Sequence, residues 1–103
     1  MRKKPERAIK TQVKEVLDRY NVYYFMPVQS GIGAAGVDFH CVVRWRGLAL
    51  AFFIETKKFG EELTARQTLF LKQREEEQNA KTFVVHSFLT LKYLTEWLEG
   101  LKD

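Results

Sequence analysis

One hairpin-like stretch in the middle of the chain constrains the fold more than any other feature. Two largely apolar runs, Val37–Trp45 and Leu48–Lys57, flank the pair Arg46 and Gly47. Two such runs separated by a two-residue turn are typical of a β-hairpin. The second run is apolar at both alternating positions until Glu55, which indicates a central strand covered by helices on each face. We therefore predict a sheet with this hairpin at its middle.

In the rest of the chain, segments with the residue pattern of a helix alternate with segments that have the pattern of a strand. Outside the hairpin, spacing of the apolar residues predicts a helix at Pro5–Tyr20, a strand at Val22–Pro27, a helix at Ala65–Gln78, a strand at Thr82–Ser87 and a helix at Leu89–Leu101. Asn79 tolerates the left-handed conformation and is expected to cap the middle helix. The order αβββαβα predicts an α/β fold, α+β by some schemes, with a four-stranded mixed sheet flanked by helices. At 103 residues, the chain fits one domain, residues 1–103.

A glycine-rich segment precedes the hairpin. Gly31, Gly33 and Gly36 match the G-x-G-x-x-G string of dinucleotide-binding proteins. That fingerprint must open a helix, whereas strand-like residues follow Gly36, so we reject the dinucleotide-binding interpretation. The glycines instead allow a tight bend or a close approach to a ligand such as a sugar-phosphate chain.

Positive charge is concentrated near the N-terminus. The formal net charge is +4, and the first helix and its approach contain Arg2, Lys3, Lys4, Arg7, Lys10 and Lys14. This asymmetry suggests a surface for a polyanion, although a solvated basic helix gives the same pattern. The candidate nucleic-acid contacts are Lys3, Lys4, Arg7, Lys10, Gly33, Lys58 and Arg66.

Cysteine content and hydropathy argue against disulfide-bonded, zinc-thiolate, secreted and membrane-spanning classes of protein. Cys41 is the single cysteine, which excludes a disulfide within the chain and a thiolate zinc cluster. The positive N-terminal residues are not followed by the apolar segment of a signal peptide, and no apolar run approaches membrane-spanning length. We expect a soluble protein of the bacterial or host-cell cytoplasm with no membrane partner.

The hairpin register predicts a cluster of charged residues. If Arg46 and Gly47 form the turn, Asp38 lies opposite Glu55, and Lys57 points to the same face two residues further on. Opposed carboxylates repel each other unless a cation or a proton intervenes. A hard divalent cation such as Mg²⁺ suits them, because it binds through one or two carboxylates, waters and substrate phosphate oxygens. An ordinary cross-strand salt-bridge cluster is the alternative.

Gln67 has two competing interpretations. Thr64 and Gln67 have the S/T-x-x-E/Q spacing of a capping box, which needs no function. A glutamine in the first turn of the helix after the E-x-K strand could equally reach a metal-bound water or a scissile phosphate. Both could hold in different states of the protein.

Taken together, these residues resemble the PD-(D/E)xK nuclease superfamily and, within it, the VRR-NUC domain family. The resemblance runs through Glu6, the Gly36–Asp38 segment, the Ile54–Lys57 strand and the Leu63–Gln67 helix start, in the family's order and spacing. It implies the restriction-endonuclease-like αβββαβ core. The departure is at Val37, where the family usually has proline. That proline shapes the backbone and takes no part in the chemistry, so its loss weakens the match only slightly.

The resemblance also implies an activity, hydrolysis of DNA phosphodiesters with Mg²⁺ or Mn²⁺ as cofactor. It implies metal ligands at Asp38, Glu55 and the backbone carbonyl of Thr56. The catalytic residues it implies are Glu6, Asp38, Glu55, Lys57 and Gln67, with Lys57 as the catalytic lysine, Glu6 as an assisting acid and Gln67 as an accessory group.

Stand-alone members of the family resemble Holliday junction resolvases in size and are associated with virus-like or bacterial genomes. A small domain that makes paired cuts in a four-way junction would act as a homodimer, for which Tyr23, Tyr24, Phe25 and Trp45 are interface candidates. Rival interpretations are a less selective DNA nuclease acting on flaps, ends or duplex, and a non-catalytic DNA-binding subunit of a larger assembly. A structural protein stabilised by ion pairs is a third alternative.

Overall fold

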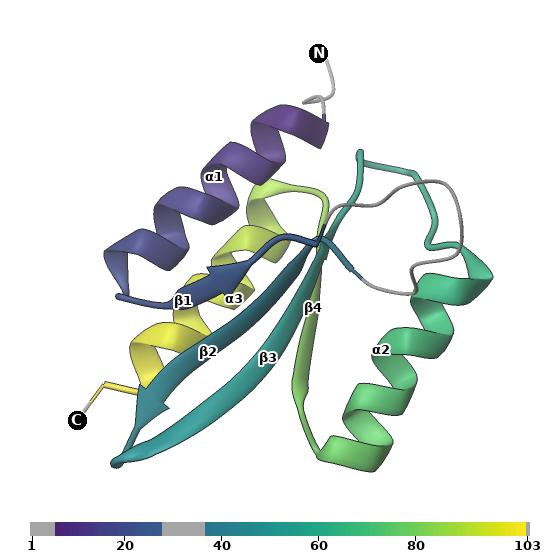
Figure 1. Ribbon diagram of the computed structural model, residues 1–103. Coiled ribbons are helices and arrows are strands. Elements are labelled where there is room, and N and C mark those ends of the chain that lie inside the picture. The colour runs from purple at the N-terminus through teal and green to yellow at the C-terminus, as the bar shows by residue number, and fades with distance from the viewer. Residues whose placement is uncertain (1–5, 28–36, 103) are drawn as a thin grey trace.

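The computed structural model describes residues 6–27 and 37–102 of the chain. Its helices and strands follow one another in the order predicted from the sequence (Figure 1). They are α1 (Glu6–Arg19), β1 (Tyr23–Phe25), β2 (Phe39–Trp45), β3 (Leu48–Thr56), α2 (Ala65–Gln78), β4 (Lys81–Val85) and α3 (Phe88–Gly100). Within these segments, no helix combines the length and apolar character needed to cross a bilayer.

The four strands form one mixed sheet, which confirms the predicted fold class. The strand order is β1-β2-β3-β4, with antiparallel pairing from β1 to β3 and parallel pairing between β3 and β4. Parallel strands need a crossover connection, and α2 supplies it. The strand that follows Gly36 also agrees with rejecting the dinucleotide-binding motif, which requires a helix there.

The hairpin turn has the geometry its residues favour. Arg46 and Gly47 both have positive φ values, 50° and 78°, as a type I′ turn requires at its two central positions. The resulting register pairs Phe39 with Ile54 and Trp45 with Leu48. This is the predicted register, and its continuation by one residue places Asp38 opposite Glu55.

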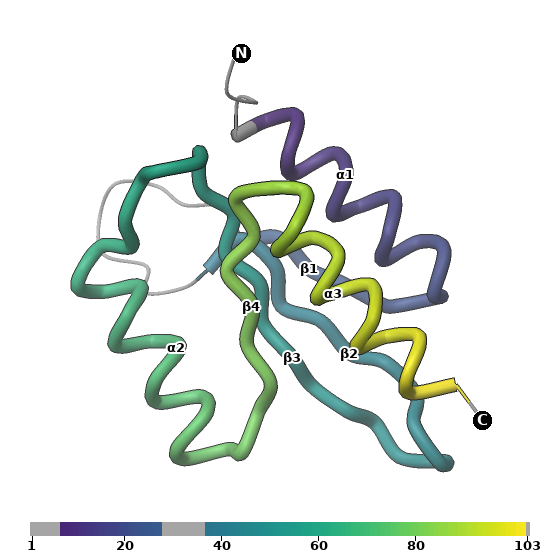
Figure 2. The backbone as a smooth tube through the Cα atoms, turned by 180° about the vertical axis from the view of Figure 1, so that it is seen from behind, coloured from purple at the N-terminus to yellow at the C-terminus, as the bar shows by residue number. Residues whose placement is uncertain are grey.

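Helices cover both faces of β3, as its uninterrupted apolar sequence predicted. Phe52 is fully buried and its ring lies 4.9 Å from that of Trp97 on α3, whereas the next residue, Phe53, faces Phe70 of α2 at 5.6 Å. Neighbouring strand residues point to opposite faces, so α2 and α3 lie on opposite sides of the sheet. Figure 2 shows α3 in front of the strands, with α1 running alongside it. The main core, which includes Val13, lies beneath those two helices.

The observed elements differ from the predicted bounds at several ends. The strand predicted at Val22–Pro27 is shorter, covering Tyr23–Phe25, and at its start the N–H of Val22 donates to the carbonyl of Leu17 in α1 at 2.9 Å. Ser87 caps α3 through its side chain, which accepts from the N–H of Thr90, so it does not extend β4. Asn79 caps α2 with φ 55°, as predicted.

Candidate active site

Asp38 and Glu55 meet at the end of the β2–β3 hairpin that lies away from the turn. The N–H of Asp38 donates to Glu55 Oε1 at 2.9 Å. Glu55 is 2% exposed. The structure therefore brings together the two acids that the hairpin register paired.

Asp38 is held by groups from two other elements. Its Oδ2 accepts hydrogen bonds from the N–H of Thr56 at 2.8 Å and from Thr56 Oγ1 at 2.6 Å. Its Oδ1 lies 3.3 Å from the Lys10 ammonium on α1. Burial opposes ionisation of Asp38, but the hydrogen bonds with Glu55 and Thr56 and the charge of Lys10 outweigh it and hold its pKa below the ordinary value. Asp38 is thus the stable anion of the pair.

Glu55 has the opposite electrostatic character. Burial, followed by the hydrogen bond and the negative charge of Asp38, raises the pKa of Glu55 to about 8. The ammonium of Lys57 lies 3.8 Å from Glu55 Oε2, which is too long for a hydrogen bond, so it offsets this only in part. Burial thus favours the neutral form of Glu55 despite the nearby ammonium.

Lys57 is almost buried beside the two acids. It is 9% exposed, and its N–H donates to the carbonyl of Val85 at 3.0 Å, which continues the ladder between β3 and β4. Its ammonium also lies 3.8 Å from Glu61 Oε1. Glu61 was not among the predicted site residues. It follows β3 in a segment without regular structure, where no periodicity in the sequence signals which side chains meet.

Gln67 forms the predicted capping box and also contacts the acid pair. Its backbone N–H donates to Thr64 Oγ1 at 3.2 Å and its Oε1 accepts from the Thr64 N–H at 2.9 Å, which completes the capping box of α2. Its Nε2 meanwhile donates to Glu55 Oε2. Because the cap fixes the first turn of α2, it also aims the amide of Gln67 at the acid pair.

The donor set around Asp38 suits a hard divalent cation. Within residues 6–27 and 37–102, no cluster of three or more His, Cys, Asp or Glu side chains is arranged to hold a metal. Mg²⁺ does not need one, since one or two carboxylates with waters and phosphate oxygens suffice. The raised pKa of Glu55 beside an ionised Asp38 marks a site where added positive charge is favourable. The residues present therefore fit such an ion.

The remaining predicted site residues are those proposed to contact DNA, together with Glu6. Lys3, Lys4, Gly33 and the side chain of Glu6 lie outside the described part of the structure. Arg7, Lys58 and Arg66 are exposed, as a contact with a polyanion requires, while Lys10 is half-buried against Asp38. A role in binding the phosphate backbone is therefore open to the three exposed residues.

The aromatic candidates for an interface differ in how exposed their side chains are. Tyr24 packs edge-on against Phe39 with ring centroids 5.6 Å apart, so it belongs to the core side of the sheet. Tyr23 and Phe25 are 70% and 54% exposed on the other face of β1. These two side chains are available to a partner, whereas Tyr24 is half-buried.

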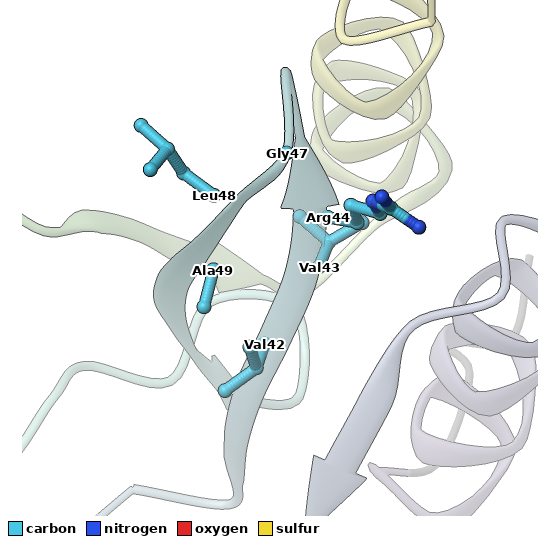
Figure 3. Close-up of a pocket in the computed structure, with 6 residues that line it drawn as sticks. All are labelled: Val42, Val43, Arg44, Gly47, Leu48 and Ala49. Carbon is cyan, nitrogen blue, oxygen red and sulfur yellow. The ribbon is translucent and has the colours of Figure 1, made fainter.

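A surface hollow at the hairpin turn does not coincide with the acid pair. Val42, Val43, Arg44, Gly47, Leu48 and Ala49 line it (Figure 3). The register puts these residues at the opposite end of β2 and β3 from Asp38 and Glu55. The hollow contains no carboxylate, so it offers none of the chemistry of the candidate site.

Comparison with known proteins bears on the fold. No protein-family model and no curated protein matches the sequence. A solved structure described as a VRR_NUC domain superimposes with a TM-score of 0.69, covering 88% of this chain and 94% of the other at 22% identity. The chain has the fold of a VRR_NUC domain. The VRR_NUC fold is the one that the resemblance in the sequence implied, and it accounts for nearly the full length of both chains.

The pKa of Glu55 predicts how stability depends on pH in the metal-free protein. Because the pKa of Glu55 is raised from 4.5 to about 8 on folding, its contribution to stability is complete below pH 4.5 and is lost as pH rises to 8. The lowered pKa of Asp38 affects stability only at pH values below this range. Inside the window, we expect the free energy of unfolding in EDTA to fall by up to about 1.4 kcal/mol per pH unit.

Urea unfolding at several pH values between 5 and 8 measures this slope. Glu55→Gln is the matched control, because it keeps the size of the side chain and removes the titrating group. A slope that is the same in Glu55→Gln and in the wild type would contradict the assignment to Glu55.

Proposed function

We propose that this chain is a single nuclease domain that hydrolyses DNA phosphodiesters with a divalent cation, Mg²⁺ or Mn²⁺. The observation that carries the proposal is the convergence of Asp38, Glu55 and Lys57 at one end of the central hairpin. Two acids beside a nearly buried lysine, on the fold of a VRR_NUC domain, are an arrangement suited to phosphoryl chemistry.

The roles of the residues follow from their charge and position. Asp38, Glu55 and the carbonyl of Thr56 would hold the cation, which when bound neutralises negative charge that develops around phosphorus. Lys57 would place its ammonium on a phosphate oxygen, where a preorganised positive charge stabilises the transition state. Gln67, already directed at Glu55, would orient the attacking water or the phosphate.

Exposed basic residues would bind the DNA backbone. Arg7, Lys58 and Arg66 have accessible charges, and Lys3, Lys4, Lys10 and Gly33 complete the proposed contact set. Phosphate contacts of this kind make affinity fall steeply with salt concentration. Salt-insensitive association with DNA would instead favour a structural protein that is stabilised by ion pairs.

For the substrate, we favour branched DNA, in particular four-way junctions cut by a homodimer. A domain of 103 residues presents little surface to a branched substrate, and paired symmetric cuts need two active sites. Tyr23 and Phe25, exposed on the edge strand, are suited to the subunit interface. A cytoplasmic location in a bacterial or host cell gives access to such DNA.

The test compares purified protein on labelled junction, flap and linear duplex DNA at equal concentration, with Mg²⁺, with Mn²⁺ and with EDTA. We expect metal-dependent cleavage that is fastest on the junction. Equal rates on all three substrates would favour the less selective nuclease, and binding without any cleavage would favour a non-catalytic subunit of a larger assembly.

A further inference from the structure

Thr56, the middle residue of the E-x-K triplet, makes two hydrogen bonds to one carboxylate. Thr56 is fully buried, and both its N–H and its hydroxyl donate to the same oxygen of Asp38, at 2.8 and 2.6 Å. The next N–H along the chain, that of Lys57, bonds to β4 instead. Thr56 pairs with Val85 of β4, but β2 begins only at Phe39, so on the β2 side the carboxylate of Asp38 accepts the hydrogen bond from the Thr56 N–H.

The two oxygens of Asp38 therefore have different surroundings. Oδ2 is directed at a residue that has no exposed surface, whereas Oδ1 faces the positive charge of Lys10 at 3.3 Å. The terminal torsion of an aspartate is intrinsically broad, so something must select this orientation. The two hydrogen bonds from the buried Thr56 to Oδ2 select this orientation.

We propose that the Thr56 hydroxyl is a positioning group, which holds Asp38 Oδ2 inside the protein so that Oδ1 is presented to a divalent cation. The inference rests on the proposed function, because it requires a cation at Asp38. It adds a role for the side chain of Thr56 to the backbone carbonyl already proposed as a ligand. Groups that orient metal ligands in this way matter greatly, since their loss typically weakens metal affinity by about 10- to 100-fold.

Isothermal titration of the metal-free protein with Mn²⁺ tests the role without relying on activity. Thr56→Val preserves the branched shape of the side chain and removes the hydroxyl, whereas Thr56→Ser retains the hydroxyl. We expect the dissociation constant for Mn²⁺ to rise by about 10- to 100-fold in Thr56→Val and to stay close to the wild-type value in Thr56→Ser.

Unfolding temperatures measured in EDTA separate positioning from stability. A purely structural hydroxyl would lower the unfolding temperature of Thr56→Val and leave the Mn²⁺ affinity of the folded protein unchanged, which would overturn the inference. If Thr56→Val does not fold, Thr56→Cys replaces it, because cysteine has the same connectivity as serine but its thiol is only a weak donor. Equal affinities in the Cys and Ser variants would overturn the inference too.

Titration of the wild type with Mn²⁺ separates a failure of the proposed function from a failure of the role proposed for the Thr56 hydroxyl. Binding of Mn²⁺ by the wild type, with equal affinity in Thr56→Val, removes the role of the hydroxyl and leaves the proposed function standing. Absence of Mn²⁺ binding by the wild type contradicts the proposed function and the inference together.

Discussion

Replacing Lys57 by alanine is expected to reduce the rate of DNA cleavage by about 10²- to 10⁴-fold, the range seen when a preorganised charge or proton-transfer group is removed. Lys57 is nearly buried beside Glu55 and does not belong to the exposed basic surface. Its loss should therefore affect the chemical step more than the binding of DNA. Single-turnover cleavage rates and the dissociation constant for DNA in Ca²⁺ or EDTA measure the two effects separately.

Lys92→Ala is the matched control for charge. Lys92 is on α3, where its side chain is 58% exposed and lies 3.8 Å from Glu96, so it pairs with an acid as Lys57 does but on the open surface. Exposed pairs of this kind contribute little to stability. We expect wild-type cleavage from Lys92→Ala. Unchanged cleavage by Lys57→Ala would remove Lys57 from the mechanism.

Replacing Phe52 by alanine is expected to cost about 3–5 kcal/mol of stability, a large share of the roughly 5–15 kcal/mol typical of a whole domain. Phe52 has no exposed surface and lies at the centre of the core, with its ring 4.9 Å from Trp97 and 6.3 Å from Phe83. Truncation leaves a cavity between β3 and α3, and the surrounding rings can fill it only in part. Urea unfolding monitored by circular dichroism measures the change.

Phe88→Ala supplies the control for that experiment. Phe88 is 75% exposed at the start of α3, so its removal creates no cavity. The expected loss is within about 0.5 kcal/mol. If the two variants were equally stable, the packing of the sheet against α3 described above would be incorrect.

The part of the site that could be predicted from the sequence is the part that one turn determines. Arg46 and Gly47 favour a type I′ turn, and a two-residue turn sets the register of every pair along the hairpin. The facing of Asp38 and Glu55 followed from that register alone, without knowledge of where the helices pack. The bounds of α2 were also predictable, because Thr64 and Asn79 are strong capping residues.

What could not be predicted depends on packing between distant segments. The contact of Lys10 with Asp38 requires α1 to lie across the open end of the hairpin, and nothing in the pattern of α1 specifies that placement. Lys10 was therefore assigned to DNA binding alone. The simultaneous cap and acid contact of Gln67 likewise depends on the angle at which α2 meets β3.

In the proposed site, Asp38 and Glu55 share one divalent cation. A crystal soaked with Mn²⁺ and measured at a wavelength that gives anomalous scattering from manganese tests it most directly. We expect an anomalous peak within bonding distance of both carboxylates, with Lys10 displaced from Asp38. Crystals that bind Mn²⁺ elsewhere, or not at all, while Asp38 and Glu55 remain as they are in the metal-free protein, would contradict it.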